Sequence, residues 1–553
     1  MRKKVSRRDF ARTTVAAAGA AVALPASLLG KAAAAATPAA VTPAAAAGAA
    51  AAATAAIAPR KRITMPIEVT YGGRMAWGRD LTLADTLTPA GEPTPNYPAG
   101  WKEGTTIPAE YYVDEHHYQK DEAFLAEHFW FMVDHHSRIP NPGDYFVFDY
   151  GRGTSVIVLR DKAGQVKAFH NVCRHRGSRL CQGSDDFRPT ESKPDGKPMD
   201  SVLSMVQLGP SGNTPVMRCV YHAWTYDLSG KLISYPKGMP DQFDASEHGL
   251  HPCYVNVVNG WIWVSLARGD APEFEPWIGN WRAVTEKYGT ADLKIATRVS
   301  APTKANWKLV LENFRECYHC YPAHTKSYSA VHQIYGNPDS ETPEQRARID
   351  AELAKWDGKP LPQSRAPRAD ANANPYRYGG DSPTGGPQPS PGASMSGMGG
   401  AGMGSHMRLG FVSGSMDGKP LSRLLPKRTE WSHYYQGASV GFSTSWLKAY
   451  DDHVVGLRFT PRDVDRTDAE LFWLVHPDAE EGKDYDVKRM QALWANTYRE
   501  DRWICENQQL GVKSDRYNFR GGQPYAAQEG GPASICQWYM REVAGQPRPK
   551  ETV

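Results

Sequence analysis

Cys173-Arg174-His175 is followed further along the chain by Cys219-Val220-Tyr221-His222. Each box offers one thiolate and one imidazole, so the two boxes together supply two sulfur and two nitrogen ligands. Ligands of these kinds bind zinc or iron in proteins. The pattern therefore predicts that two separate loops of the chain fold together around a metal site.

Two kinds of site take two Cys and two His. A Rieske [2Fe–2S] cluster does so because two His replace two Cys on one of its irons. A structural zinc is the alternative, but zinc fingers usually keep their Cys pair and their His pair apart, whereas each box here holds one of each. We therefore favour a cluster over zinc or plain core packing, with the ligands Cys173, His175, Cys219 and His222.

The residues around the boxes favour the same interpretation. Phe169-His170-Asn171-Val172-Cys173-Arg174-His175-Arg176-Gly177 and Cys219-Val220-Tyr221-His222-Ala223-Trp224-Thr225-Tyr226-Asp227 resemble the two cluster loops of Rieske ring-hydroxylating oxygenase large subunits. The chain departs from that family because its two boxes lie unusually far apart. The excess, about Gly183 to Pro215, is rich in Ser, Asp, Pro and Gly and predicts a polar surface loop. Loop insertions of this kind cost little closure entropy.

The oxygenase branch fits better than the respiratory branch. Respiratory Rieske proteins carry an additional Cys in each loop, and these two Cys form a disulfide. Ser178 and Tyr221 stand at the corresponding places here, and Cys181 has no partner in the second loop. The resemblance therefore implies a low-potential cluster that passes electrons to a second metal. An exported Rieske electron carrier without oxygenase activity is the alternative of another class, although a carrier would not need the long chain that follows.

A second motif resembles the mononuclear iron site of the same oxygenases. It is Asn306-Trp307-Lys308-Leu309-Val310-Leu311-Glu312-Asn313-Phe314-Arg315-Glu316-Cys317-Tyr318-His319-Cys320-Tyr321-Pro322-Ala323-His324. Non-haem Fe(II) oxygenases use two His and one carboxylate, and the resemblance makes His319 and His324 the two His. A five-residue step turns about 140° on a helix. We therefore expect Pro322 to break the helix, so that both rings turn to one metal.

The third iron ligand comes from a later segment. Tyr498-Arg499-Glu500-Asp501-Arg502-Trp503-Ile504-Cys505-Glu506-Asn507-Gln508-Gln509-Leu510-Gly511 resembles the last helix of the family, and the iron-binding Asp of that helix matches Asp501. Glu500 is its neighbour and would point to a different helix face. We expect Glu500 to form no more than a surface salt bridge.

Glu316 stands three residues before His319, which places both on one face of a helix. In the family that the chain resembles, a carboxylate here joins a cluster His to an iron-ligand His across a subunit boundary, and the resemblance implies that role. Most aromatic dioxygenases use Asp at this place, whereas Glu is similar to the choline, glycine betaine and carnitine monooxygenase branch. Glu312 lies one turn earlier in the sequence. A functional role and a purely structural one, in which Glu312 pairs with Arg315 or Lys308, are both open.

The first residues resemble an export signal. Ser6-Arg7-Arg8-Asp9-Phe10-Ala11-Arg12 matches the twin-arginine pattern, a mildly apolar Ala-rich stretch follows, and an Ala-x-Ala cleavage site falls within Ala32–Ala36. Twin-arginine export carries folded proteins that already hold their cofactors. We therefore expect a periplasmic protein. A cytoplasmic location is the alternative, because NADH-linked reductases are cytosolic.

The chain divides into five segments by composition and pattern. They are a twin-arginine signal peptide (1–36), an Ala/Pro-rich linker (37–65), an N-terminal arm with helices (66–139), a Rieske domain (140–268) and a catalytic domain (269–553) with a Pro/Gly/Met-rich insertion near 358–404. Local patterns predict a helix over Asp114–Trp130, two strands in Gly151–His170 around a turn at Lys162–Gly164, and a strand over Gly260–Leu266.

The resemblance implies an α+β fold. It consists of an all-β Rieske domain inserted before a helix-grip (START-like) catalytic domain, in which an antiparallel sheet surrounds a long helix.

The formal net charge of +4 comes with no basic patch that would indicate a nucleic-acid partner. The eight Cys do not suggest a disulfide framework. Besides the cluster ligands and the two that flank His319, we expect buried thiols at Cys181, Cys253, Cys505 and Cys536.

The resemblance also implies a reaction. A separate reductase or ferredoxin would reduce the [2Fe–2S] cluster, electrons would cross to the mononuclear Fe(II) of a neighbouring subunit, typically in a homotrimer, and O2 would hydroxylate a small organic substrate. Three segments are similar to glycine betaine monooxygenases: Tyr450–Val455, Asp484–Asp486 and Gln509–Ser514. They favour oxidative N-demethylation of a quaternary amine, with aromatic ring hydroxylation or O-demethylation as the alternative. A ring of aromatic side chains with a carboxylate would favour the cation, and an apolar slot would favour the arene.

Overall fold

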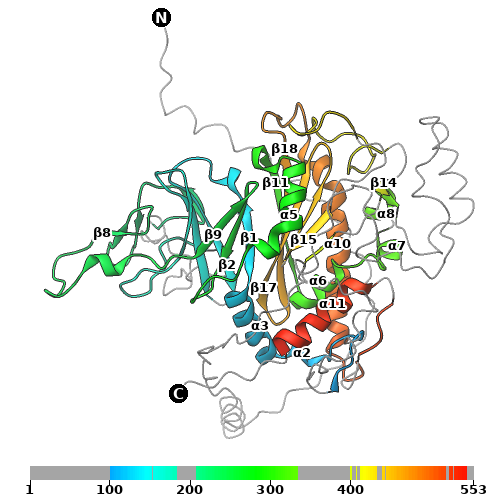
Figure 1. Cartoon of the computed structure of the whole chain (residues 1–553), viewed down its shortest axis with the longest axis horizontal. Coiled ribbons are helices and arrows are strands. Elements are labelled where there is room, and N and C mark those ends of the chain that lie inside the picture. The colour runs from blue at the N-terminus through cyan, green and yellow to red at the C-terminus, as the bar shows by residue number, and fades with distance from the viewer. Residues whose placement is uncertain are drawn as a thin grey trace, which may run out of the picture. The chain divides into compact units, whose positions relative to one another are not determined.

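The structure is a computed structural model that describes residues 100–151, 153–183, 207–324, 326–333, 399–401, 406–407, 411–431, 439–442, 444–517, 522–526 and 529–544. All of them lie in one compact unit, residues 70–548 (Figure 1). The predicted signal peptide, the linker and most of both insertions lie outside the described residues. Among the helices in the described ranges, none combines the length and apolar character needed to cross a bilayer.

The first long helix, α3 (Glu115–His128), begins where the sequence predicts it. Asp114 caps it, because its side chain accepts hydrogen bonds from the backbone N–H groups of His116 and His117 at 2.7 and 3.2 Å. The helix ends before Trp130, because Trp130 already belongs to a strand.

The cluster-binding part consists of three small antiparallel sheets with the orders β1-β10-β9, β4-β3-β2-β5 and β6-β7-β8. Their bounds are β1 (Trp130–His135), β2 (Asp144–Gly151), β3 (Thr154–Arg160), β4 (Val166–His170), β5 (Ser211–Asn213), β6 (Met217–Arg218), β7 (Thr225–Tyr226), β8 (Leu232–Ser234), β9 (Tyr254–Val258) and β10 (Trp261–Ser265). The predicted hairpin is β3 with β4. Its turn is held by the Asp161 carboxylate, which accepts hydrogen bonds from the backbone N–H groups of Ala163 and Gln165 at 2.9 and 2.8 Å. The predicted strand at 260–266 is β10.

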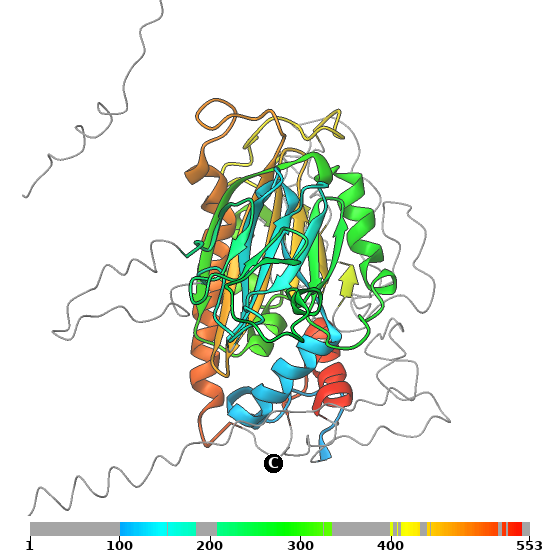
Figure 2. The same cartoon turned by 90° about the vertical axis from the view of Figure 1, so that its left-hand side faces the viewer.

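The catalytic part contains a six-stranded antiparallel sheet of order β11-β18-β17-β16-β15-β13. The bounds are β11 (Lys294–Thr303), β13 (Gly399–Ala401), β15 (Ser439–Phe442), β16 (Ser445–Ala449), β17 (Val454–Asp463) and β18 (Arg466–Val475). The long helix α10 (Val487–Val512) packs along this sheet (Figures 1 and 2). Gln491 of α10 donates to the hydroxyl of Thr297 in β11 at 2.6 Å. The expected antiparallel sheet around a long helix is confirmed.

The other face of this sheet packs against the cluster-binding part, as Figure 1 shows for β1 and β2. Gly456 of β17 lies against the indole ring of Trp261 in β10, and an added Cβ would come within 2.6 Å of that ring. Glycine is therefore needed at this contact between the two layers. Arg458 of β17 also donates to the carbonyl oxygen of Val133 in β1.

Short helices complete the catalytic part: α2 (Glu110–Val113), α5 (Glu275–Lys287), α6 (Trp307–Asn313), α7 (Cys320–Ala323), α8 (Tyr328–Val331) and α11 (Gly530–Trp538), with the two-residue strands β12 (His332–Gln333) and β14 (His406–Met407). Every residue of α6 is buried, including Lys308, whose ammonium contacts the carboxylate of Asp121 in α3. Asp121 also accepts from the indole N–H of Trp307 at 3.0 Å and from the hydroxyl of Tyr539 at 2.8 Å. These bonds pair the buried charges and tie α3, α6 and the C-terminal segment together.

Candidate metal centres

The two cluster loops have the same backbone form. In each loop the carbonyl oxygen of the Cys accepts a hydrogen bond of 3.0 Å from the backbone N–H group four residues later. This N–H group belongs to Gly177 in the first loop and to Ala223 in the second. Both of these residues have a left-handed backbone, with φ of 71° for Gly177 and 58° for Ala223. The N–H groups of Cys173 and Cys219 also donate at 2.8 Å to the carbonyl group five residues later. Two matched turns therefore present the two boxes to one place.

The four predicted ligands lie together in this arrangement. Cys173 and Cys219 are buried and their thiols share a hydrogen bond, which lowers the pKa of Cys219. The rings of His175 and His222 have centroids 4.7 Å apart, and His175 is exposed. Paired thiols on the inside and paired imidazoles at the surface fit a [2Fe–2S] cluster with one iron turned outward.

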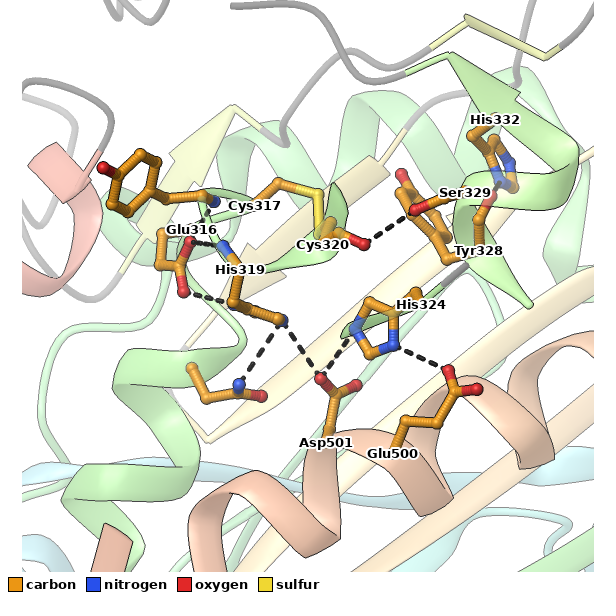
Figure 3. Close-up of a disulfide and its surroundings, with 12 residues drawn as sticks. Glu316, Cys317, His319, Cys320, His324, Tyr328, Ser329, His332, Glu500 and Asp501 are labelled. Carbon is orange, nitrogen blue, oxygen red and sulfur yellow. Dashed lines mark hydrogen bonds and ion pairs between the residues drawn. A yellow bond between two sulfur atoms is a disulfide. The ribbon is translucent and has the colours of Figure 1, made fainter. Parts of the chain in front are cut away.

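The second centre gathers residues from two segments far apart in the sequence (Figure 3). The Nε2 atoms of His319 and His324 lie 3.1 and 2.9 Å from the same oxygen, Oδ1 of Asp501. Asp501 is buried on α10. The structure thus brings together the two His and the carboxylate that the sequence singles out, which is the ligand set of a non-haem iron site.

Pro322 does not separate the two His in the way we expected. α6 already ends at Asn313, and a new one-turn helix, α7, contains Pro322. His319 is the N-cap of α7 and His324 its C-cap, and the two ring centroids lie 5.1 Å apart. The prediction of a break at Pro322 is wrong, because N–H groups in the first turn of a helix need no partner within it and proline is tolerated there.

Two further carboxylates hold the outer nitrogens of the imidazoles. Nδ1 of His319 donates to Glu316, and Nδ1 of His324 donates to Glu500 at 2.8 Å. Glu316 lies between α6 and α7 rather than on a helix, so the expectation of a shared helix face is wrong, although the contact with His319 is present. Glu500 also accepts from the hydroxyl of Ser327. The expected surface role of Glu500 is therefore wrong as well, because its longer side chain reaches the same site as Asp501.

The electrostatics of the centre suit a cation. Burial disfavours the charged form of His319, but hydrogen bonds to Asp501 and Glu316 outweigh it and raise its pKa to about 10. Burial would raise the pKa of Asp501, but the hydrogen bonds from His319 and His324 hold it below its usual value. A buried, ionised carboxylate between two imidazoles is the charge arrangement that a divalent iron would complete.

A disulfide joins Cys317 to Cys320 beside this centre (Figure 3). The sequence did not lead us to expect it, although the Cys-x-x-Cys spacing was the signal that could have suggested it. The sulfur of Cys320 lies within 4.8 Å of donor nitrogens of both His319 and His324. A disulfide sulfur is not a thiolate, so Asp501 is the better third ligand.

The remaining motif residues have structural roles. Glu312 is buried in the core and accepts from the hydroxyl groups of Tyr112 and Tyr525 at 2.9 and 3.2 Å, which supports the structural interpretation. Asp452 accepts from the hydroxyl of Ser413 at 2.9 Å. Asp486 caps α10 through the N–H of residue 489 at 2.8 Å. Of the expected buried thiols, three are buried and Cys253 is partly buried.

A cluster of aromatic side chains, which we call the ring cluster, extends from His324. Its members are Tyr328, His332, Trp446, Tyr450 and Trp494. Trp494 lies about two turns before Asp501 on the same face of α10. Tyr328 begins α8, shortly after His324 at the end of α7. The helical spacing of Trp494 from Asp501 was the sequence signal for this ring, and it was missed.

Comparison with known proteins identifies the family. Residues 129–244 match the Rieske [2Fe-2S] domain, and residues 290–545 match the catalytic domain of the ring hydroxylating alpha subunit. The glycine betaine monooxygenase oxygenase subunit of Chromohalobacter salexigens is 30% identical over 436 residues, which cover 78% of this chain and 85% of that protein. The chain belongs to the Rieske oxygenase alpha subunits.

Other members of the family agree with this placement. The glycine betaine monooxygenase oxygenase subunit of Pseudomonas aeruginosa is 28% identical over 467 residues, which cover 84% of this chain and 95% of that protein. A solved quaternary ammonium Rieske monooxygenase, in complex with an inhibitor, shares the fold with a TM-score of 0.53 and 20% identity, and the match covers 80% of this chain and 96% of that chain. As a Rieske oxygenase alpha subunit, the protein carries a [2Fe–2S] cluster and a mononuclear iron and works with O2, a small substrate and a separate electron donor.

Proposed function

We propose that this Rieske oxygenase removes a methyl group from a small quaternary ammonium compound by oxidation. One atom of O2 enters a C–H bond of an N-methyl group, and the other leaves as water. Two electrons from the donor and two protons complete the balance. The C–N bond to the hydroxylated methyl group then breaks, its electron pair stays on nitrogen, and formaldehyde, a proton and a tertiary amine are released. The names of the relatives from Chromohalobacter salexigens and Pseudomonas aeruginosa support this substrate class.

The observation that carries the proposal is the ring cluster beside the iron site. Tyr328 lies 6.5 Å from the ring of His324 and 5.5 Å from that of Trp494, and Trp494 lies 4.9 Å from Trp446. Aromatic faces attract a quaternary ammonium through their quadrupole. The carboxylate of Glu500, which contacts His324, adds negative charge at the iron end of the cluster.

We assign the iron to His319, His324 and Asp501, and the cluster to Cys173, His175, Cys219 and His222. When bound, a mononuclear Fe(II) with open positions supplies the activation of O2. The chain itself orients the ligands, because Glu316 and Glu500 fix the rings of the two His through their Nδ1 atoms.

We further infer a homo-oligomer, typically a head-to-tail trimer, in which Glu316 joins the cluster of one subunit to the iron site of the next. In Figure 1 the strand β8, which pairs with β7 just after the second cluster loop, lies at the far left, whereas α7 lies at the right. The two cluster loops carry the exposed residues His175 and Tyr221, one in each loop. Both observations support electron entry from a neighbouring subunit.

We propose a periplasmic location, reached by twin-arginine export directed by the pattern at Ser6–Arg12. The disulfide between Cys317 and Cys320 supports this, because disulfides persist in oxidising compartments such as the bacterial periplasm. Fractionation of the native host, with antibody detection of the protein in periplasm and cytoplasm, tests the location.

The proposed reaction is tested with purified protein, an artificial electron donor and O2. Glycine betaine, choline and an aromatic hydrocarbon are supplied separately, and formaldehyde is measured against O2 consumed. We expect formaldehyde from a quaternary ammonium compound in a ratio near one to one. Hydroxylated arene without formaldehyde would overturn the proposal in favour of ring hydroxylation.

A further inference from the structure

A disulfide closes a short loop around one of the iron-site histidines. Its two Cys, Cys317 and Cys320, are three residues apart, so His319 lies inside the loop (Figure 3). Both Cys side chains are buried, whereas Tyr318 between them is exposed, which places the loop at the surface of the chain. The loop therefore connects that surface to the iron site.

The sulfur of Cys320 lies beside the nitrogen ligands. Its Sγ and ring nitrogens of His319 and His324 all lie within 4.8 Å of one another. A sulfur and a nitrogen that bind one zinc ion are at most about 4.4 Å apart, because Zn–S is about 2.3 Å and Zn–N about 2.1 Å. Rotation of a freed Cys320 side chain covers the difference. Opening the disulfide therefore brings a thiol into the site.

Hydrogen bonds hold this loop independently of the disulfide. The carbonyl oxygen of Cys320 accepts from the N–H group of His324 at 3.0 Å and from the hydroxyl of Ser329 at 2.7 Å. The N–H group of His319 donates to the carboxylate of Glu316 at 3.2 Å. These bonds do not depend on the S–S bond, so the two His and Cys320 stay close together when it opens.

The two redox states of the loop offer different ligands. In the disulfide form the sulfur is not a thiolate, and two imidazoles with the carboxylate of Asp501 form the set typical of non-haem Fe(II). In the dithiol form Cys320 adds a thiolate, and mixed Cys and His ligands are typical of zinc. Zn(II) also binds a given site more tightly than Fe(II) does. The second ligand set therefore favours zinc.

We propose that the disulfide between Cys317 and Cys320 determines which metal the site binds. The disulfide form binds iron through His319, His324 and Asp501. The dithiol form binds zinc through His319, Cys320 and His324, and the Cys320 thiol loses its proton to the solvent as it binds. Zinc has no redox chemistry, so the dithiol form is inactive as an oxygenase. The inference goes beyond the proposed function, because it holds for any substrate.

A dithiol reductant converts one form into the other. It donates two electrons and two protons, the S–S bond of the loop breaks, two thiols form on the protein, and the reductant itself becomes a disulfide. The direction of the reaction follows the compartment, because dithiols persist in the cytosol and disulfides in the periplasm.

The first test compares the two forms of the wild-type protein. A chelator removes the mononuclear metal, the visible spectrum shows that the cluster is intact, and one half is treated with dithiothreitol, which is then removed without air. Equal amounts of Fe(II) and Zn(II) are offered to each form, and bound metals and free thiols are measured. We expect the ratio of bound zinc to bound iron to rise about 10-fold or more on reduction. An unchanged ratio, with the loop thiols free, would overturn the proposal.

X-ray absorption at the zinc edge identifies the ligands directly, because the iron of the cluster does not contribute there. We expect one sulfur at about 2.3 Å from zinc in the dithiol form and only nitrogen and oxygen neighbours in the disulfide form. A zinc ion without a sulfur neighbour in the dithiol form would overturn the assignment of Cys320.

Two variants separate the roles of the two sulfurs. Cys317→Ala abolishes the disulfide but keeps the thiol of Cys320, so it should bind zinc like the dithiol form without any reductant. Cys320→Ala abolishes both the disulfide and the competing sulfur, so it should keep the metal preference of the disulfide form. The same preference in both variants would show a purely structural disulfide and contradict the proposal. Cys253→Ala, at a partly buried Cys in the cluster-binding part, is the matched control, and the cluster spectrum shows that each variant is folded.

Discussion

Oε2 of Glu500 lies 2.8 Å from Nδ1 of His324, although Glu500 is the immediate neighbour of Asp501 on α10. Adjacent residues on a helix point about 100° apart, so two neighbouring carboxylates rarely serve one site. Here the longer side chain of Glu500 reaches around to the outer nitrogen, while Asp501 meets the inner nitrogens of both His. The imidazole of His324 is thereby held from both sides.

This arrangement predicts that Glu500→Ala weakens iron binding without removing a ligand. Loss of such an outer partner typically lowers metal affinity about 10- to 100-fold. Titration of the protein with Fe(II), followed by analysis of bound iron, measures the effect. The exposed neighbour Arg499 provides the control Arg499→Ala. Wild-type iron affinity in the Glu500 variant would show that the hydrogen bond to His324 does not position the ligand.

Glu316 should affect electron transfer rather than metal loading. Glu316→Gln keeps the size of the side chain and removes its charge, so we expect both metals to remain bound while substrate-coupled turnover falls by about 10-fold or more. Rapid mixing of the reduced protein with O2 and substrate, monitored at the cluster absorbance, gives the rate. An unchanged rate of cluster oxidation contradicts the bridging assignment, and Glu316→Asp should recover part of the rate.

The ion pair between Lys308 and Asp121 should matter strongly for stability. Removing one partner, as in Lys308→Met, leaves an uncompensated buried charge and should lower the free energy of unfolding by about 3–5 kcal/mol. The double variant Lys308→Met/Asp121→Leu should recover much of this loss, because neither charge is then buried. Urea denaturation monitored by tryptophan fluorescence compares the variants. A double variant no more stable than the single one would argue against charge burial as the cause.

Glu312 should make stability depend on pH. Burial, opposed only in part by hydrogen bonds from Tyr112 and Tyr525, raises its pKa from 4.5 to about 7. Between pH 4.5 and about 7, Glu312 therefore keeps its proton in the folded protein and has lost it in the unfolded chain. This contribution is fully present below pH 4.5 and is lost as the pH rises through about 7. Glu312→Gln should flatten the fall in unfolding free energy across that range, and Glu480→Gln, at an exposed glutamate, should not. An unchanged slope in Glu312→Gln would refute the assignment.

The sequence predicted the fold and most of the iron site because both depend on motifs that the family shares. The boxes at Cys173 and Cys219 and the pair His319 and His324 are short segments with fixed spacing. Asp501 was found by its match to a family helix, and the structure brings it to the two His.

The rest depended on tertiary contacts that a linear pattern does not contain. Helix spacing alone places Glu500 on a different face from Asp501. It does not show that the longer side chain of Glu500 reaches Nδ1 of His324. Pro322 was expected to break a helix, but α6 had already ended at Asn313, so proline met only the tolerant first turn of α7.

The central claim is that the chain combines a cluster with a mononuclear iron held by His319, His324 and Asp501. Iron analysis of the purified protein tests it most directly, together with Asp501→Ala and a cluster spectrum for each sample. We predict about three iron atoms per chain in the wild type and about two, with an intact cluster spectrum, in Asp501→Ala. A wild type with only about two irons, unchanged by Asp501→Ala, would contradict the account.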